Sequence, residues 1–446
     1  MSLALPDLSK YHSVFEHEYI KKLGRVSQVV GLTIESVGPD VNIGTTCVIR
    51  SSISDRSVMA EVVGFRDSRI LLMPLGHMRG IGPGSVVESL HKPLSILVSD
   101  QLLGRVLNGL GHPIDNLGPI AGGKAYPISN EPPDPLFRNR ITEAMPLGVK
   151  VIDGLLTIGK GQRIGIFAGS GVGKSTLMGM IARNTEAEIN VIGLVGERGR
   201  EVREFLEKDL GEEGLRRSVV VVATSDQPAL VRLKAASVAT SVAEYFRSQG
   251  KHVLLLMDSI TRYAMAQREV GLATGEPPVS RGYTPSVFSV MPQLLERAGN
   301  SENGSITGLY TILVDGDDFT EPVTDTARSI LDGHIVLDRK IANRNQYPAV
   351  DVLASVSRVM TDVVTDDHKH SANEIKKSMA IYAYAEDLIN VGAYVRGSSA
   401  EIDDAISKHG PIRDFLAQAV GDRFDFQSSV DHMAGIINQE EPVPAS

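Results

Sequence analysis

The 446-residue chain has a single cysteine, no tryptophan and no long apolar run. Because Cys47 has no second cysteine to pair with, an internal disulfide is excluded and a reducing compartment fits. Cys47 stands in a β-branched run, which predicts a buried and unreactive thiol. The longest apolar runs, such as residues 253–257, are far shorter than the roughly 20 residues that span a membrane. The N-terminus also lacks the features of a signal peptide, so we expect a cytoplasmic protein.

Basic residues are not in excess either. Lys and Arg number 45 against 54 Asp and Glu, which gives a formal net charge of −9. This balance argues against a protein whose main task is to grip nucleic acid. A hydrophobic content of 42% is typical of a globular protein, and the length predicts two or three domains.

The first 93 residues show two patterns. Within residues 1–22, apolar side chains recur at helical spacing, which predicts an N-terminal helix. This helix either lies on its own domain or docks a regulatory partner, and the sequence leaves both readings open. Residues 23–93 contain short β-branched runs separated by glycine and proline, which predicts a small β-barrel. The predicted barrel strands cover residues 26–30, 47–50, 58–63 and 69–73.

A different pattern covers residues 94–362, where apolar strands alternate with amphipathic helices. This alternation predicts an α/β domain with a largely parallel sheet. Its clearest strands are residues 163–167, 191–195, 219–223 and 252–257, while residues 108–140 are expected to form a long surface connection. Residues 363–446 predict a helical C-terminal domain with helices over 371–391 and 399–420. The expected fold class is therefore multi-domain: β-barrel, central α/β domain, and α-helical domain.

The strongest chemical signal is a glycine-rich loop that follows a predicted strand and opens a helix near Thr176. Backbone N–H groups in such a loop converge on phosphate oxygens, and the helix N-terminus adds partial positive charge. Lys174 is expected to reach the β- and γ-phosphates of ATP, or the β-phosphate of ADP, and the Ser175 hydroxyl to ligate Mg²⁺. A chance glycine-rich turn would not bring strand, lysine, hydroxyl and helix into register. The predicted binding residues are Gly169, Ser170, Gly171, Val172, Gly173, Lys174, Ser175 and Thr176.

A P-loop also needs an acidic group for the metal at the end of a neighbouring strand. Asp258 and Asp315 both end predicted strands, and strand-end aspartates are often only turn residues. We favour Asp258 because the strand that it ends is wholly apolar. That strand also follows the P-loop by a few strand–helix units. Asp315 stays open as the alternative.

Further residues fit binding and hydrolysis of the nucleotide. Glu197 and Arg198 follow a buried strand, at the edge of the sheet where ligands bind, so Glu197 would orient water and Arg198 would contact the γ-phosphate. Alone, this pair would be read as a solvated turn. Arg358 is a candidate arginine finger for a neighbouring subunit, and Tyr347 a candidate for stacking on adenine. Taken singly, a surface arginine and a core tyrosine would be the simpler readings.

Together these residues resemble the family of rotary and export ATPases, over nearly the whole chain. Pro348-Ala-Val-Asp-Val-Leu-Ala-Ser-Val-Ser357 is similar to the signature shared by the α and β subunits of F-type ATP synthases. The P-loop, residues 196–202, and residues 280–288 with 294–299 are similar to flagellum-specific and type III secretion ATPases. Residues 24–35 look closer to the flagellar branch.

The resemblance implies a β-barrel, a RecA-like nucleotide domain and a helical domain in a subunit that forms homohexamers with ATP sites between subunits. It also implies a stator-like regulator at the N-terminus, export chaperones and substrates at the C-terminal domain, and an export gate at the cytoplasmic face of the inner membrane. By position, Glu197 would be the catalytic carboxylate and Arg262 a further active-site arginine. Asp258 would hold the metal through water. Ala168 stands where the general P-loop pattern has glycine, as this branch also shows.

Three other functions are possible on the same nucleotide-binding core. A catalytic subunit of a rotary ATP synthase would carry a long acidic contact loop in its C-terminal domain, whereas this chain has only scattered acids there. A non-catalytic ring subunit would lack the carboxylate at Glu197. A hexameric RNA translocase would need stacking aromatics in its N-terminal domain, but Phe65 is the one aromatic residue between 23 and 93. We therefore expect an Mg²⁺-dependent ATPase of protein export.

Overall fold

A computed structural model describes residues 22–314, 316 and 318–438, which fall into two compact units. The first unit runs to Leu94 and includes Ala273–Gly275, and the second comprises Ser95–Leu272 and the chain from Glu276 onward. The N-terminal helix predicted from residues 1–22 lies outside the described residues except for Lys22. Among the described helices, none combines the length and apolarity required to cross a bilayer.

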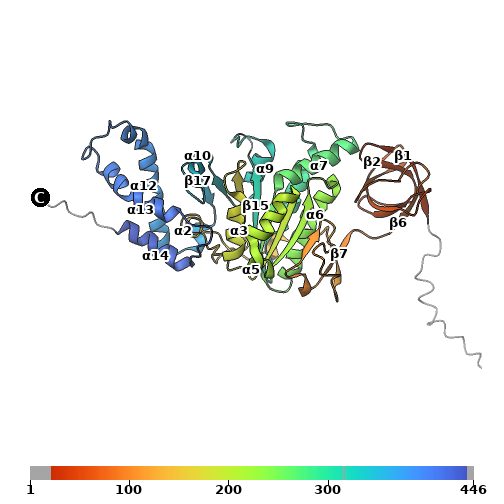
Figure 1. Cartoon of the computed structure of the whole chain (residues 1–446), viewed down its shortest axis with the longest axis horizontal. Coiled ribbons are helices and arrows are strands. Elements are labelled where there is room, and N and C mark those ends of the chain that lie inside the picture. Colours follow the sequence, from red (N-terminus) through yellow and green to blue (C-terminus); the bar gives the residue numbers. More distant parts are fainter. Residues whose placement is uncertain (1–21, 315, 317, 439–446) are drawn as a thin grey trace, which may run out of the picture. The chain divides into compact units, whose positions relative to one another are not determined.

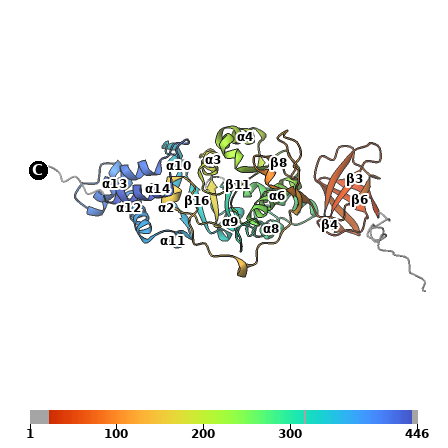
Figure 2. The same cartoon turned by 90° about the horizontal axis from the view of Figure 1, so that it is seen from below.

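The first unit is a closed antiparallel barrel, with strand order β1-β2-β5-β4-β3-β6 (Figures 1 and 2). Alternate residues of each strand point inward, so Val26, Ile34, Cys47 and Ile49 pack in its core. The predicted barrel is thus confirmed, but β2 and β6 were missed because both are short and carry polar residues. The strands are β1 (Leu23–Val30), β2 (Thr33–Val37), β3 (Thr46–Arg50), β4 (Ser57–Arg66), β5 (Arg69–Pro74) and β6 (Val86–Ser89).

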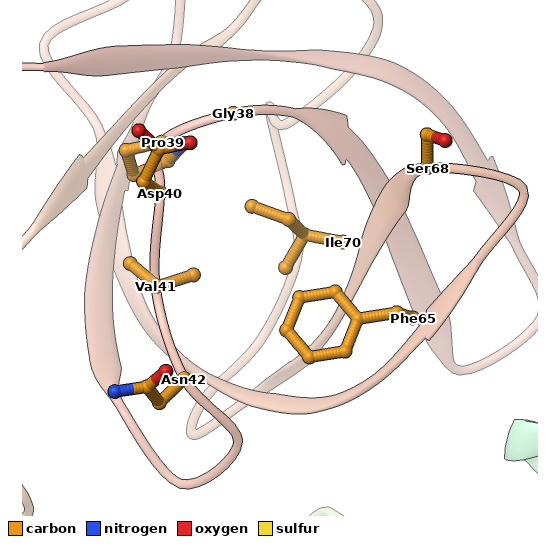
Figure 3. Close-up of a pocket in the computed structure, with 8 residues that line it drawn as sticks. All are labelled: Gly38, Pro39, Asp40, Val41, Asn42, Phe65, Ser68 and Ile70. Carbon is orange, nitrogen blue, oxygen red and sulfur yellow. The ribbon is translucent and has the colours of Figure 1, made fainter.

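One mouth of the barrel holds a cavity of about 400 Å³, formed by the turn at residues 38–42 and by Phe65, Ser68 and Ile70. Figure 3 shows Val41, Phe65 and Ile70 pointing toward its centre. None of the residues predicted to bind nucleotide lines it.

The second unit is built on a sheet with strand order β17-β16-β10-β15-β13-β11-β12-β8, and β14 pairs with β15 at its side (Figure 1). Strands along this path are parallel except β17, which pairs antiparallel with β16. The strands are β8 (Val106–Asn108), β10 (Arg163–Ala168), β11 (Ile189–Glu197), β12 (Ser218–Thr224), β13 (His252–Asp258), β14 (Gly299–Asn300), β15 (Ser305–Leu313), β16 (Gly333–Leu337) and β17 (Val350–Ser357). A separate pair, β7 (Ser95–Val98) and β9 (Lys124–Pro127), lies partly in the predicted surface connection.

Helices cover this sheet and bury nearly all residues of its central strands. All nine residues of β11 are buried, as expected for a parallel strand covered on both faces. The helix α6 packs on β11, β12 and β13. The helices of this domain are α2 (Lys150–Leu155), α3 (Lys174–Asn184), α4 (Gly199–Glu204), the π-helical turn η4 (Phe205–Leu210), α5 (Gly211–Arg216), α6 (Ala229–Arg247), α7 (Ile260–Thr274), α8 (Pro285–Leu295), α9 (Pro322–Ile330), α10 (Arg339–Asn343) and α11 (Met360–Val363), with short 3₁₀ turns at η2 (Asp100–Leu102) and η3 (Pro135–Phe137).

The chain after α11 is helical, which confirms the third part of the predicted fold class. Its helices are α12 (Asp366–Asn390), α13 (Ala400–Leu416) and α14 (Phe426–Ile437), of which α14 was not predicted. Side-chain caps define two of the helix starts: Thr365 accepts from His368 N, and Asp425 accepts from Gln427 N and Ser428 N. These helices pack on α2, where a Cβ on Gly154 would lie 2.8 Å from Phe415 and from Met433.

Candidate nucleotide-binding site

The glycine-rich loop connects the end of β10 to the first turn of α3. Gly171 and Gly173 adopt left-handed conformations, with φ of 78° and 88°, which explains why glycine is needed at both positions. Val172 is buried and anchors the loop, whereas Ser170 and Ser175 are exposed. The helix begins at Lys174, so the sequence placed its start slightly too late. The first turn of a helix has N–H groups without intrahelical partners, and such groups bind phosphate in P-loops.

Lys174 meets two carboxylates from neighbouring strands. Its Nζ lies 2.5 Å from Asp258 Oδ1 and 3.8 Å from Glu197 Oε1. β11 and β13 are parallel neighbours, with Leu194 paired with Asp258, so their carboxyl ends meet at one edge of the sheet. The structure thus brings the predicted P-loop lysine together with both predicted carboxylates.

Glu197 is buried and held by an arginine from α7. Arg262 Nε donates to Glu197 Oε1 at 3.1 Å. Its side chain lies across Gly196, whose φ is 74° and where a Cβ would come within 3.0 Å of Arg262 atoms. The pKa of Glu197 is raised to about 7, first by burial and then by the neighbouring Glu201 and Asp258 carboxyls, while Lys174 and Arg262 act in the opposite direction.

Among the described residues, the other two predicted arginines make no side-chain contact with Lys174, Glu197 or Asp258. Arg198 is exposed, and its guanidinium contacts Glu201 at 3.5 Å. Arg358 follows the edge strand β17 and is also exposed. Its backbone N–H donates to Asp332 O, but within the described residues no side-chain partner of Arg358 is found.

Tyr347 lies beside the P-loop. A Cβ on Gly173 would be 3.4 Å from Tyr347 Cδ1, and the ring is partly exposed. The carbonyl of Tyr347 accepts from the backbone N–H of Gln418, which lies after α13. The Gln418 side chain in turn accepts from Lys150 N and donates to Gly148 O. This buried amide joins the Tyr347 loop to the helical domain.

Sequence reasoning missed four polar residues near these groups: Glu201, Thr261, Thr311 and Gln418. Only Glu201 had a usable signal, because it is a second carboxylate four residues after Glu197, in the first turn of α4. The others come close through folding alone. The alternative metal residue, Asp315, lies outside the described residues.

The residues present fit a nucleotide with Mg²⁺. The loop and the start of α3 offer N–H donors and a lysine for phosphates, while Ser175 and Asp258 offer the hard oxygen atoms that Mg²⁺ prefers. Within the described residues, no hydrogen bond engages the Ser175 hydroxyl, so it is available to a ligand. A P-loop at the carboxyl edge of a parallel sheet, with two carboxylates beside its lysine, defines a RecA-like nucleotide-binding domain.

Comparison with known proteins agrees with this class. The family model for the nucleotide-binding domain of the ATP synthase alpha/beta family matches residues 148–357, and that for its beta-barrel domain matches residues 26–91. The model for the T3SS EscN ATPase C-terminal domain matches residues 364–435.

Individual relatives match over nearly full length. The chain is 55% identical to a flagellum-specific ATP synthase of Bacillus subtilis, over 94% of this chain and 96% of the relative. It is 50% identical to a type 3 secretion system ATPase of Xanthomonas euvesicatoria, over 93% and 94%. The assembled ATPase EscN of enteropathogenic E. coli is 46% identical, with a TM-score of 0.88 over 93% of this chain and 100% of EscN; its complex with the central stalk EscO gives 0.86 over the same shares. The chain therefore belongs to the ATP synthase alpha/beta family, among its flagellum-specific and type III secretion ATPases.

Proposed function

We propose that this chain is a Mg²⁺-dependent ATPase that works as a homohexameric ring and drives flagellar-type, or type III, protein export. The observation that carries the proposal is the convergence of Lys174, Asp258, Glu197 and Arg262 at the P-loop. A ring subunit that only bound nucleotide would not need a buried carboxylate with a raised pKa beside the phosphate site.

Each residue of the cluster then has a role in hydrolysis. Lys174 and the N–H groups of the P-loop bind the β- and γ-phosphates, so Lys174 must exchange its contact with Asp258 for the nucleotide. Ser175 and Asp258 would hold Mg²⁺, Asp258 through water, and a metal held there would supply positive charge to neutralise the phosphate oxygens. Glu197, with a pKa near the working pH, orients and polarises the attacking water. Arg262 positions Glu197 through its hydrogen bond.

The remaining predicted residues complete the site from its edges. Tyr347, next to Gly173, packs on the adenine ring of ATP or ADP. Arg198 contacts the γ-phosphate when it leaves Glu201. Arg358, exposed at the end of an edge strand, reaches the site of the next subunit and stabilises transition-state charge there.

The proposed partners follow the relatives. EscN assembles and binds a central stalk, and a corresponding stalk is expected in this ring. We further propose a stator-like regulator at the N-terminal segment, export chaperones and substrates at α12–α14, and an export gate at the cytoplasmic face of the inner membrane. Nucleic acid is not a proposed partner, in keeping with the net charge of −9.

Steady-state ATPase activity against protein concentration tests this function. The variants are Glu197→Gln and Arg358→Ala, with Arg216→Ala as a control because Arg216 is also exposed and pairs only with Glu212 among the described residues. We expect activity per subunit to rise steeply with concentration, to fall at least about 100-fold in the first two variants, and to be unchanged in the control. Activity that is flat with concentration and unaffected by Arg358→Ala would reject the shared-site ring. A wild-type protein that binds ATP without hydrolysing it would reject the enzyme.

A further inference from the structure

Thr311 is a buried hydroxyl in the middle of an apolar sheet. It lies on β15 between Tyr310 and Ile312, and its exposed fraction is 0%. A hydroxyl removed from water costs free energy unless it finds a hydrogen-bond partner. Valine has nearly the same shape and would fill this position without that cost. Threonine is therefore expected at this position only if its hydroxyl has a hydrogen-bond partner.

That partner is the carboxylate of Asp258. Thr311 Oγ1 lies 2.7 Å from Asp258 Oδ1 and 3.4 Å from Met257 O. β13 and β15 are parallel neighbours in which Met257 pairs with Tyr310, so Asp258 and Thr311 follow at the same level on the same face. The hydroxyl has one proton, and the shorter contact assigns it to the carboxylate, where the bond is charge-assisted.

Both observed contacts of the Asp258 side chain use the same oxygen. Lys174 Nζ and Thr311 Oγ1 each donate to Oδ1. Within the described residues no donor reaches Oδ2. Two donors on one oxygen restrain rotation of the carboxyl group and leave the other oxygen available to accept from a ligand.

The end of β15 is itself fixed on two sides, so Thr311 is a rigid support. The N–H of Leu313 donates to Thr261 Oγ1 at 2.8 Å, and the N–H of Val314 donates to Ala168 O at 3.1 Å. The first contact reaches the start of α7, which also carries Arg262. The second reaches the last residue of β10, directly before the P-loop.

We propose that Thr311 is a positioning residue that orients Asp258 for metal binding. When Lys174 leaves Oδ1 for the phosphates, the Thr311 hydroxyl is the remaining donor on that oxygen and keeps the carboxyl from rotating. Oδ2 would then remain available to accept from water bound to Mg²⁺. This inference rests on the proposed ATPase function and on Asp258 as the metal-side carboxylate.

The test compares three variants of full-length protein: Thr311→Val, Thr311→Ser and Thr307→Val. Thr307 is a matched control, because it lies on the same face of β15, is equally buried, and its hydroxyl accepts from Gly161 N at the other end of the strand. The measured quantities are kcat, KM for ATP, the free Mg²⁺ concentration for half-maximal activity, and the melting temperature.

We expect Thr311→Val to raise the half-saturating Mg²⁺ concentration about tenfold and to lower kcat by about the same factor. Thr311→Ser should stay within about twofold of wild type, because it retains the donor. Thr307→Val should lower the melting temperature without changing the Mg²⁺ requirement. The purely structural reading predicts instead that both valine variants lose stability alike and keep the wild-type Mg²⁺ dependence.

Two results would overturn the inference: wild-type Mg²⁺ dependence in Thr311→Val, or an equal shift in Thr307→Val. Binding of a fluorescent ATP analogue, titrated with Mg²⁺, separates this failure from that of the proposed function. A wild-type protein without hydrolysis rejects the ATPase, while the Mg²⁺ titration of binding still decides the role of Thr311.

Discussion

At the scale of single residues, the environment of Glu197 is the main electrostatic feature of the site. Burial disfavours its charged form, and the carboxyls of Glu201 and Asp258 add to this effect, so its pKa rises to about 7. The pKa of Glu201 moves in the opposite direction, first through its hydrogen bond with Glu197. Glu197 is therefore the protonated member of this pair below about pH 7.

This arrangement predicts a pH dependence. Glu197 can polarise water only when it is deprotonated, so kcat/KM should rise with pH through about 7 and level off above it. Glu201→Gln removes one of the groups that raise the pKa of Glu197, and we expect the rising limb to move to lower pH. The measurement is the pH–rate profile at low ATP concentration for both proteins.

Protonation of ATP itself affects both pH–rate profiles equally. The difference between the two profiles therefore reports the pKa of the protein group. Coincident limbs for wild type and Glu201→Gln would show that Glu201 does not control the proton on Glu197. The melting temperature of Glu201→Gln, compared with wild type at each pH, provides the control for folding.

At the scale of elements, a buried ion pair joins three segments of the nucleotide domain. Arg297, just after α8, makes two hydrogen bonds of 2.8 Å to Glu244 on α6. It also donates to Ser241 and to the carbonyl of Ile128, in the segment after β9. Both charged side chains are almost fully buried, so each depends on the other for compensation of its charge.

Breaking this pair should therefore destabilise the domain strongly. We expect Arg297→Met to lower the free energy of unfolding by about 3–5 kcal/mol, because it leaves Glu244 as an uncompensated buried charge. The double variant with Glu244→Gln should recover part of the loss. Urea denaturation followed by circular dichroism measures both.

The matched control is Arg203→Met, which removes an exposed pair with Glu207. Such surface pairs contribute about 0–1 kcal/mol, so this variant should unfold almost as wild type does. Equal losses in Arg297→Met and Arg203→Met would contradict the importance assigned to burial.

At the scale of the whole molecule, one chain supplies most of the proposed site but not all of it. Lys174, Glu197, Asp258 and Arg262 converge within a single chain. Arg358 lies at the end of an edge strand with an exposed side chain, away from this cluster. In the proposed ring, each site combines the cluster of one subunit with Arg358 of its neighbour, as a head-to-tail interface allows.

Mixing two inactive variants tests this sharing. Glu197→Gln and Arg358→Ala subunits, combined in equal amounts and allowed to exchange, should form intact sites at about one quarter of interfaces if assembly is random. We therefore expect the mixture to regain up to about a quarter of wild-type ATPase activity. The double variant Glu197→Gln/Arg358→Ala, mixed with either single variant, is the control and should stay inactive. No recovery in the first mixture would indicate that the two residues act in the same subunit.

Local sequence patterns predicted the residues whose role depends on the backbone conformation of their own segment. The P-loop needs left-handed glycines, a lysine and a helix start within a few positions, and the structure has all of them in order. The sequence also predicted that Glu197 and Asp258 lie near the P-loop. Both residues end predicted strands, and parallel strands bring their carboxyl ends to one edge of a sheet. Short elements were harder: β2, β6 and α14 were missed because a few residues carry too little periodicity.

The sequence by itself thus determined the fold class, the family and the main candidate residues, since these depend on periodicity and on motifs of contiguous residues. Tertiary structure alone decided which side chains support them. Thr311 meets Asp258 from 53 positions away, and Gln418 meets Lys150 from 268 positions away. Contacts of this kind are set by strand order, register and helix packing, which no local pattern specifies.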